Sequence, residues 1–231
     1  DLIKSAIAQS LKANAIVGAP TTWVIDNHDN PRSVTRYAST THLDGHYVPA
    51  VYSDLNEQDI EAGKLRSRAM ALLMLSLPGA AYIYNGQELE LPNVDDLPNE
   101  VLQDPVFFRT NGEQKGRDGC RVPLPWTTEE SSFGFGKDGS HLPQPAWFKN
   151  VAVSVQEENP ESNLNLYRKL TSNRRMLQTV EEARFVNHFF NRNIVHVARP
   201  NGWHSVTNFG TKPVKLPAGK LLVSTLPLVA G

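Results

Sequence analysis

Polar residues that could do acid–base chemistry stand directly after an apolar stretch near the start of the chain. The apolar stretch is Trp23-Val24-Ile25, and Asp26-Asn27-His28-Asp29 follows it, before Asn30-Pro31 breaks the backbone. Carboxylates and a neutral imidazole can exchange protons, and they offer the directional hydrogen bonds that an uncharged, polyhydroxylated substrate needs. A buried strand with polar residues at its carboxyl end is how parallel α/β folds build active sites.

Within this group, the carboxylate of Asp29 is the strongest candidate for a catalytic role. Strand alternation points Asp26 away from Asn27 and toward a structural contact. Two arginines, Arg32 and Arg36, follow closely in the sequence. Their guanidinium groups can offer several hydrogen bonds to the oxygens of a substrate.

A metal site is the alternative use of such residues. The ligands that could be assembled for it are His28, Asp29, His42, Asp44 and His46. They lie on a strand tip and a loop, without the i, i+4 spacing of a zinc-binding helix, and the single cysteine excludes a thiolate cluster. We therefore expect no metal.

The hydrophobic pattern around the polar residues predicts alternating helices and strands. Helices are expected over residues 1–17 and 59–77, and strands over 21–25 and 80–84. The second strand also ends in a polar cluster, Asn85-Gly86-Gln87-Glu88. This order is typical of βα units with a parallel sheet, so both polar clusters are expected on the same rim. There Glu88 either hydrogen-bonds a ligand or holds the strand end.

The remainder of the chain divides into an irregular region, one further helix and a set of short strands. Residues 92–148 are rich in proline, glycine and aromatic side chains that require burial or a ligand. The spacing of apolar residues predicts a helix over 162–176. Strands of period two are predicted at 186–190, 194–197, 203–209, 214–216 and 221–225. These strands indicate a small antiparallel β domain that begins near residue 178.

Bulk properties exclude several classes of protein. The 231-residue chain is 40% hydrophobic and 20% charged, with a net charge of -1, so it has no bulk attraction for nucleic acid. Its longest apolar run, Ala69–Leu75, is too short to cross a membrane. Cys120 is the single cysteine and can form no internal disulfide, which fits a reducing compartment. A cytoplasmic location is therefore expected.

Four segments resemble a known family of enzymes. DNHDNPRSVTR at 26–36 resembles the last catalytic region of the alpha-amylase superfamily of glycoside hydrolases. QDPVFFR at 103–109 and GRDGCRVPLPW at 116–126 resemble its alpha-glucosidase (maltase-like) branch. LPGAAYIYNGQEL at 77–89 is similar to the family's segment around the eighth barrel strand. The resemblance covers nearly the whole chain, and the motifs stand in the expected order.

The resemblance implies an α/β fold in which residues 1–177 form the C-terminal part of a (β/α)8 TIM barrel. They supply its last two βα units, with Thr21–Ile25 and Ala80–Tyr84 as the last two strands and 92–148 as an irregular excursion. Residues 178–231 are then expected to form a small antiparallel β-sandwich domain that is incomplete.

The resemblance also implies roles for individual residues. Asp29 matches the catalytic carboxylate that stabilises an oxocarbenium-like transition state. His28 matches the imidazole that hydrogen-bonds glucose in the first subsite, and Arg32 matches the arginine near that subsite. Arg36 and the loop after it are expected to shape the outer sugar sites, and Asn27 is counted among the substrate-binding residues. No cofactor is implied.

The implied activity is that of a retaining, exo-acting alpha-glucosidase on short, maltose-like oligosaccharides. Its nucleophile and acid/base lie on earlier strands, so the expected partner is the missing N-terminal part of the same enzyme. Two of eight strands cannot close a barrel, so the chain alone is expected to be inactive and poorly soluble. Two alternatives remain open. One is a relative that transfers or isomerises sugars, such as a trehalose synthase or sucrose isomerase, and the other is a non-catalytic amylase-like binding subunit.

Overall fold

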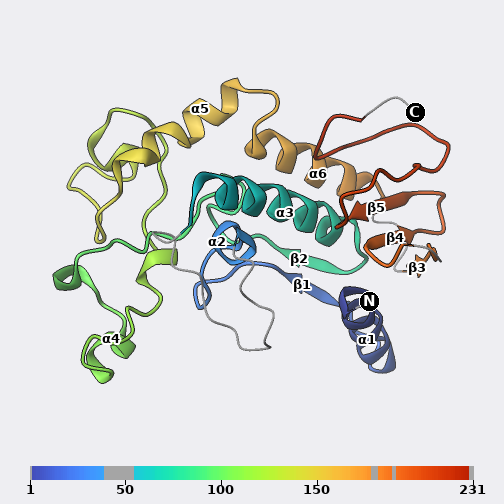
Figure 1. The fold of residues 1–231 in the computed structure, drawn as a ribbon, viewed down its shortest axis with the longest axis horizontal. Coiled ribbons are helices and arrows are strands. Elements are labelled where there is room, and N and C mark those ends of the chain that lie inside the picture. The colour runs from blue at the N-terminus through green and yellow to red at the C-terminus, as the bar shows by residue number, and fades with distance from the viewer. Residues whose placement is uncertain (1, 39–54, 178–181, 189–190, 229–231) are drawn as a thin grey trace. The chain divides into compact units, whose positions relative to one another are not determined.

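The computed structural model describes residues 2–38, 55–177, 182–188 and 191–228 (Figure 1). The chain forms two compact units, each assembled from separate stretches. The first unit comprises Asp1–Ile25, Arg68–Tyr82 and Tyr167–Gly231, and the second comprises Asp26–Ser67 and Ile83–Leu166. Two helices, α3 (Glu57–Ser76) and α6 (Asn163–Leu177), contribute residues to both units. Among the helices described, none is long and apolar enough to cross a bilayer.

Two parallel strands of the first unit precede the polar clusters in the sequence. β1 (Thr22–Val24) pairs with β2 (Ala80–Tyr82), with Trp23 opposite Ala81. Parallel strands require a long crossover connection, and α3 lies in that connection. The predicted parallel pair is therefore confirmed. Both strands are shorter than predicted, because within the described residues this sheet has only two strands and each is paired along one edge. Their place as the last two strands of a barrel stays a prediction.

The turn from α3 into β2 depends on a glycine. Gly79 has a positive φ of 95°, and a Cβ atom added to it would lie 2.1 Å from the carbonyl oxygen of Thr21. This close approach lets the backbone N–H of Ala80 donate to the same oxygen at 2.8 Å. Beside it, the indole Nε1 of Trp23 donates to the carbonyl of Pro78 at 2.6 Å. A larger residue at position 79 would therefore disturb the start of the strand pair.

The C-terminal part of the first unit is a three-stranded antiparallel sheet. Its strands are β3 (Arg184–Phe185), β4 (Ile194–Ala198) and β5 (His204–Asn208), in that order. Three imidazoles form a chain across it. Nε2 of His188 lies 3.0 Å from Nδ1 of His196, whose Nε2 lies 2.8 Å from Nδ1 of His204.

The prediction of strands at 214–216 and 221–225 is wrong. Both segments are irregular in the structure, and the described residues of this region form no second sheet. Residues 214–216 stand between Pro213 and Pro217, which remove two backbone donors, and Leu221 and Leu222 are exposed rather than packed. The described residues of this region thus form a single antiparallel sheet, and the expected sandwich stays a prediction.

Both ends of the chain meet in the core of the first unit. Helix α1 (Leu2–Ile16) and the end of α3 pack with the central strand β4. The buried side chains of this cluster are Ile7, Leu73, Leu77, Val195 and Val197. Burying side chains of this size stabilises the unit by roughly 1.5–3 kcal/mol each relative to exposure.

Two buried arginines satisfy the carbonyl groups at the C-terminus of α3. Arg174, from α6, donates through Nη1 and Nη2 to the backbone carbonyls of Leu75, Leu77 and Gly79. Arg199 donates through Nη1 to the carbonyl of Ser76 at 3.1 Å. The last carbonyls of a helix have no partner within the helix, and a cation there also complements the negative end of the helix dipole. These side chains therefore complete the end of α3.

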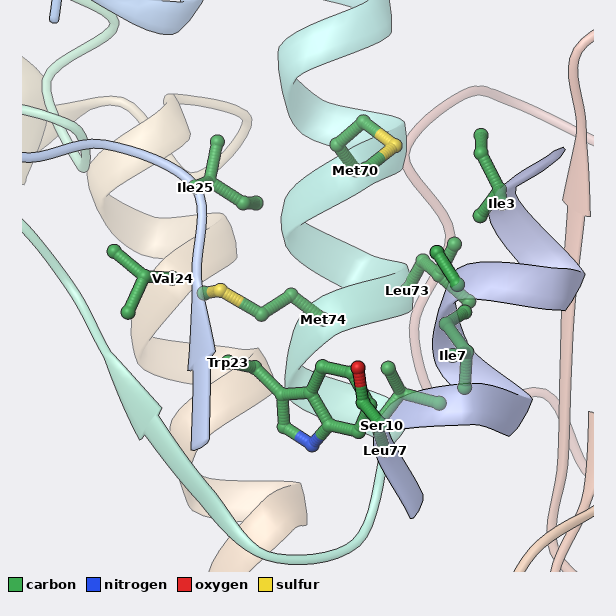
Figure 2. A pocket seen from close by; sticks show the side chains of 11 residues that line it. Ile3, Ile7, Ser10, Trp23, Val24, Ile25, Met70, Leu73, Met74 and Leu77 are labelled. Carbon is green, nitrogen blue, oxygen red and sulfur yellow. The ribbon is translucent and has the colours of Figure 1, made fainter. Parts of the chain in front are cut away.

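An apolar pocket of about 250 Å³ lies between α1, β1 and α3 in the first unit (Figure 2). Its lining includes Ile3, Ile7, Val24, Met70 and Leu73, and Ser10 supplies the one hydroxyl among the lining residues. A sugar requires many directional hydrogen bonds, which such a lining does not offer. The pocket is therefore no candidate for a saccharide site.

The second unit is mostly irregular, yet it has a core of its own. Its α-helices, besides parts of α3 and α6, are α2 (Ser33–Ala38), α4 (Pro105–Arg109) and α5 (Val153–Glu158). Its short 3-10 helices are η2 (Asn99–Val101), η3 (Asp118–Cys120), η4 (Ser131–Gly134) and η5 (Ala146–Asn150). The buried residues of its core are Leu89, Leu91, Val94, Leu97, Leu102, Val122, Leu124, Leu142 and Phe148. Residues 92–148, the segment predicted as an irregular excursion, contain short helices and no strand, and most of these core residues belong to it.

The aromatic residues of the excursion divide into two groups. Phe107, Phe133 and Trp147 pack against the core that contains Phe148. Phe108, Trp126 and Phe135 remain exposed. Burial therefore accounts for the first group.

Candidate functional site

The segment that carries Asp29 is folded into a turn by Asn27. The side-chain oxygen Oδ1 of Asn27 accepts hydrogen bonds from the backbone N–H of Asp29, at 2.8 Å, and from Nδ2 of Asn30, at 3.0 Å. A side-chain oxygen that caps the N–H two residues later is the mechanism by which asparagine forms turns. Asn27 thus determines where the Asp29 backbone lies.

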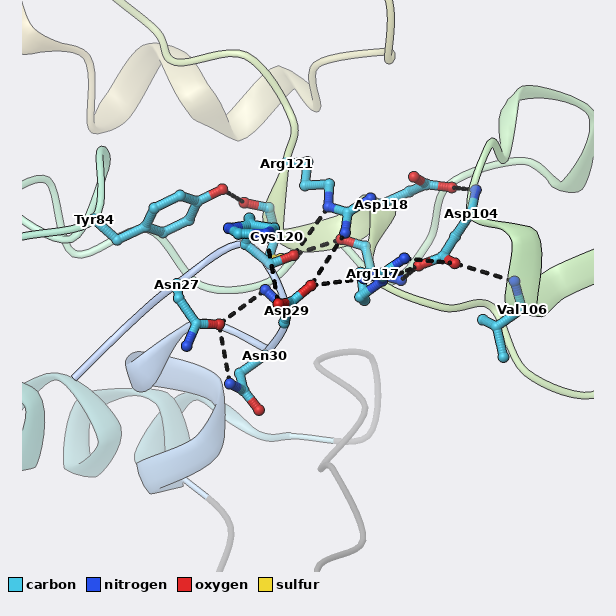
Figure 3. Close-up of polar contacts among 11 residues, drawn as sticks. Asn27, Asp29, Asn30, Tyr84, Asp104, Val106, Arg117, Asp118, Cys120 and Arg121 are labelled. Atoms are coloured by element: carbon cyan, nitrogen blue, oxygen red, sulfur yellow. Dashed lines mark hydrogen bonds and ion pairs between the residues drawn. The ribbon is translucent and has the colours of Figure 1, made fainter. Parts of the chain in front are cut away.

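The carboxylate of Asp29 faces two arginines, Arg117 and Arg121 (Figure 3). A histidine flanks it as well. Nη1 of Arg117 donates to Oδ1 of Asp29 at 2.6 Å, and Nη2 of Arg121 lies 3.6 Å from the same oxygen. Nε2 of His28 lies 3.5 Å from Oδ2. The side chain of Asp29 is 50% exposed and that of His28 is 67% exposed. One side of the carboxylate is therefore fixed, while solvent reaches the rest.

Arg117 is itself held by a second carboxylate. Its Nε donates to Oδ2 of Asp104 at 2.5 Å, and its Nη2 donates to Oδ1 at 3.2 Å. These hydrogen bonds hold the pKa of the Asp104 carboxyl well below its usual range. Hydrogen bonds to Asp104 and then to Asp29 raise the pKa of the Arg117 guanidinium. Both partners therefore stay charged across the range of pH in which proteins work.

Asp118 orders the backbone on which Asp104 stands. Its Oδ2 accepts hydrogen bonds from the backbone N–H groups of Gln103, at 2.6 Å, and Asp104, at 2.9 Å. Asp118 begins η3, a single short turn that separates Arg117 from Arg121. This turn allows both guanidinium groups to reach Asp29.

Contacts of Arg121 and Tyr84 fix the neighbouring backbone. Nε of Arg121 donates to the carbonyl of His28 at 2.9 Å. The hydroxyl of Tyr84 donates to the carbonyl of Cys120 at 3.1 Å. Cys120 is buried, and burial raises the pKa of its thiol, so it is a structural residue rather than a nucleophile.

Arg32 is buried and connects two polar segments of the second unit. Its Nη1 donates to the carbonyl of Asn85 at 2.9 Å, and its guanidinium lies 5.0 Å from the ring centre of Tyr84. Burial lowers the pKa of the Arg32 guanidinium, against the opposing effects of Tyr84 and nearby acidic groups. Gly86 is required beside it, because a Cβ atom at Gly86 would lie 2.7 Å from Nη1 of Arg32. Arg32 thus holds the segment after β1 against the segment after β2.

Arg36 lies in a different group of contacts, around Asp26. Nη1 of Arg36 lies 3.0 Å from Oδ1 of Asp26 and donates to the carbonyl of Pro31 at 2.6 Å. The hydroxyl of Ser33 donates to Oδ2 of Asp26 at 2.8 Å. Asp26 is buried, and these contacts confirm the structural role expected for it. These contacts of Arg36 support the start of α2, and its expected place at the outer sugar sites stays a prediction.

Glu88 also makes a local structural contact. Its Oε2 accepts a hydrogen bond from the backbone N–H of Gly86 at 2.9 Å. Burial raises the pKa of the Glu88 carboxyl, in opposition to the effect of that hydrogen bond and of Arg32. These contacts favour the second of the two roles considered for it, in which it holds the strand end.

Sequence reasoning missed Arg117, Arg121 and Asp104. The first two flank a short turn in the GRDGCRVPLPW motif, and Asp104 lies in the QDPVFFR motif. The charged residues within these two motifs were the signal that could have marked them as candidates for the site. Arg117 and Arg121 share the partner Asp29, which stands 88 residues before Arg117, so local spacing alone could not pair them.

The metal alternative can be tested only for part of its proposed ligand set. His42, Asp44 and His46 lie outside the described residues. Within the described residues, no group of three histidine, cysteine or acidic side chains could hold a metal ion.

Comparison with known proteins relates the chain to carbohydrate-active enzymes. A family model described as the catalytic domain of alpha amylase matches residues 2–183. A probable alpha-glucosidase of Rhizobium meliloti (strain 1021) is 35% identical over 153 residues, which are 66% of this chain and 24% of that protein. Maltase 1 of Drosophila virilis is 26% identical over 185 residues, 79% of this chain and 25% of that protein. The chain thus spans about a quarter of the length of these relatives.

The fold is likewise similar to solved structures. The alpha-glucosyl transfer enzyme XgtA matches with a TM-score of 0.64 and 27% identity, over 85% of this chain and 32% of that one. A trehalulose synthase variant, MutB D415N, matches with a TM-score of 0.64 and 19% identity, over 89% of this chain and 37% of that one. At 19% identity, the similarity to MutB concerns the fold alone.

Proposed function

The chain belongs to the alpha-amylase family, and on this premise we propose that it is the C-terminal part of a retaining alpha-glucosidase. The proposed substrates are short, maltose-like oligosaccharides with a terminal alpha-glucosidic bond. The observation that carries the proposal is the half-exposed carboxylate of Asp29, which Arg117 holds from one side and His28 flanks on the other.

The chemistry of glycoside cleavage suits this arrangement. The transition state carries positive charge on the sugar ring, and hydrogen bonds to ring hydroxyls strengthen as that charge develops. A carboxylate offers about four acceptor positions, of which Arg117 uses one, so Asp29 retains acceptors for sugar hydroxyls. The exposed imidazole of His28 stands beside it and can hydrogen-bond the same sugar.

The charges around Asp29 favour an uncharged substrate. Arg117 and Arg121 are the cations closest to it, and the carboxylates of Asp29 and Asp104 neutralise them. A phosphorylated sugar would require cations that are not already paired. Neutral oligosaccharides need none, which supports glucosides as the substrate class.

The catalytic pair of a retaining enzyme is proposed to lie upstream. Such a pair places two carboxyl groups about 5–5.5 Å apart, one as nucleophile and one as acid/base. Asp104 shares Arg117 with Asp29 but is buried and engaged by hydrogen bonds, so it does not suit either role. We therefore propose that the partner of this chain is an N-terminal part of the same enzyme. Residues 1–177 then belong to its barrel and 178–231 to a C-terminal β domain.

The remaining predicted site residues support the loop that carries Asp29. Asn27 fixes the turn, Arg32 ties the loop to Asn85, and Arg36 pairs with Asp26. In the proposal, Asn27 and Arg32 support the first subsite, where His28 reaches the sugar, and Arg36 helps to shape the outer sugar sites.

Glucosyl transfer is a second candidate, because the likeness to XgtA is a likeness to an alpha-glucosyl transfer enzyme. Retaining hydrolysis and transfer share a covalent glycosyl-enzyme and differ in whether water or a second sugar attacks it. Analysis of the products formed from maltose distinguishes them: glucose alone indicates hydrolysis, and longer or rearranged saccharides indicate transfer or isomerisation.

The proposal is tested in the longer enzyme with maltose and p-nitrophenyl alpha-glucoside. Asp29→Asn keeps the shape of the side chain and removes its charge, so kcat is expected to fall by about three orders of magnitude or more with the circular dichroism unchanged. Near-normal turnover of the variant would show that Asp29 has a structural role and no catalytic one. A wild-type enzyme that binds maltose but cleaves no glucoside would favour a non-catalytic binding subunit.

A further inference from the structure

We propose that the imidazole chain of His188, His196 and His204 is a pH-sensitive contact that holds β3 on the sheet of the first unit and releases it when the chain takes up two protons. This inference goes beyond the proposed function, because the three histidines make no contact with the carboxylate of Asp29. It assigns the response to mild acid to one strand of the sheet rather than to the whole unit.

The three rings are joined in series across the sheet. Nε2 of His188 lies 3.0 Å from Nδ1 of His196, and Nε2 of His196 lies 2.8 Å from Nδ1 of His204. His196 stands opposite Val206 of β5, so His204, two residues before Val206, is its diagonal neighbour on the same face. His196 is 5% exposed, His188 is half-buried and His204 is exposed. Water can therefore exchange protons with the outer rings but hardly with the central one.

The number of protons decides whether both bonds of the imidazole chain can exist. A neutral imidazole has one donor and one acceptor nitrogen, so neutral His196 donates to one neighbour and accepts from the other. One added proton is tolerated, because a cationic outer ring donates to His196, which then donates to the neutral ring on its other side. When both outer rings are cationic, two N–H groups face His196, which has a single acceptor. Moving a proton onto His196 does not help, since a cationic ring accepts nothing. The second proton therefore breaks one of the two bonds.

The surroundings of His196 offer no negative charge that would compensate for a second proton. Among the described residues, the groups that act on its charge are His204, His188 and Arg184 of β3, and none of them is an acid. Burial, followed by these three groups, lowers the pKa of His196 to about 4. Arg199, which follows β4, instead binds the carbonyl of Ser76. The central ring therefore stays neutral in mild acid, and the added protons go to the outer rings.

The bond between His188 and His196 lies on the weaker side of the sheet. β3 pairs with β4 through two residues, Arg184 and Phe185, whereas β5 pairs with β4 along five. After β3, the backbone N–H of Val186 donates to the carbonyl of His196 at 2.9 Å, and the ring of His188 makes the next contact with β4. Because β5 has the longer pairing, we expect the second proton to break the bond at His188 and to loosen residues 184–188.

Hydrogen exchange of the longer enzyme, measured by mass spectrometry of its peptides, tests this proposal. Protection factors are compared, because they correct for the pH dependence of exchange itself. Between about pH 7 and about pH 5, where histidines take up their proton, the protection of residues 184–188 is expected to fall by about tenfold, as for the loss of one hydrogen bond. The protection of residues 204–208 is expected to change by less than about twofold, because β5 keeps its pairing with β4.

Variants of the outer rings distinguish this contact from three histidines that titrate independently. A glutamine amide can either donate to His196 or accept from it, so one cationic ring at the other end leaves both bonds intact. His204→Gln and His188→Gln are therefore each expected to abolish nearly the whole loss of protection in acid, because the loss needs both outer rings. His141→Gln removes an exposed histidine of the second unit and is the matched control, with the wild-type loss expected.

Three results would overturn the inference. The first is equal protection of residues 184–188 at both pH values in the wild type. The second is a partial loss in each outer variant, which independent titration predicts. The third is an equal loss in residues 204–208, which would show that the whole sheet opens together. Where His188→Gln lowers protection already at neutral pH, His204→Gln carries the test, because its side chain is exposed. None of these results depends on activity toward a glucoside.

Discussion

The loss of Arg174 is expected to destabilise the first unit strongly. Its buried guanidinium donates to three backbone carbonyls at and beyond the C-terminus of α3. Arg174→Leu leaves these carbonyls without that donor, and an unsatisfied buried group costs roughly 1–3 kcal/mol. Because neighbouring losses do not add fully, we expect the free energy of unfolding to fall by about 3–5 kcal/mol.

Urea denaturation of the longer enzyme, followed by far-ultraviolet circular dichroism, measures this change. Arg175→Leu is the matched control, because Arg175 stands next to Arg174 in α6 but is exposed, and its replacement is expected to change stability by less than about 0.5 kcal/mol. Arg174→Lys keeps the charge without the fork and should lose about 1–2 kcal/mol. If Arg174→Leu proved as stable as Arg175→Leu, the end of α3 would not depend on this side chain, and the reasoning would be refuted.

Two further predictions concern pH and the isolated chain. Burial, followed by the neighbouring imidazoles of His204 and His188 and the charge of Arg184, lowers the pKa of His196 to about 4 from an ordinary value of 6.5. As the pH falls, His196 is therefore protonated in the unfolded state at a higher pH than in the folded state. The free energy of unfolding should fall by roughly 1–2 kcal/mol as pH drops from about 6.5 toward about 4. Urea midpoints of wild type and His196→Gln measure this loss, and an equal pH dependence in both would contradict it. Residues 1–231 alone are expected to release no p-nitrophenol from p-nitrophenyl alpha-glucoside and to elute as aggregates in size-exclusion chromatography. An active monomer would contradict the proposal that the catalytic pair lies upstream of this chain.

Local patterns in the sequence were sufficient for most of the regular elements. The predicted helices over 1–17 and 59–77 correspond to α1 and α3, and the two predicted parallel strands pair as expected. The two helices end at clear stop signals, Gly18 and Pro78-Gly79. The strands expected after residue 213 fail because prolines and unpartnered leucines override the alternating pattern.

The candidate site was predictable only in part. Asp29 and His28 follow from a polar cluster directly after a strand, which is a local signal. The contacts of Arg117 and Asp104 depend on the path of the irregular segment through turns at Gly112 and Gly116. This segment has no hydrophobic periodicity from which its path could be predicted. The structure is needed to show which side chains meet across such a segment. The sequence shows only that its motifs contain charged residues, which usually have partners.

The cluster that joins Ile7 to Val195 has a bearing on how the protein is made. A ribosome synthesises α1 long before β4, so the part of this core that β4 supplies forms last. Contacts between distant residues also form slowly, since closing a long loop costs entropy before any contact stabilises it. During that interval Ile7 and Leu73 are available to other apolar surfaces, including those of unfinished copies. The yield of folded protein in the cell is therefore expected to depend on translation rate and on chaperones as well as on the strength of the finished core.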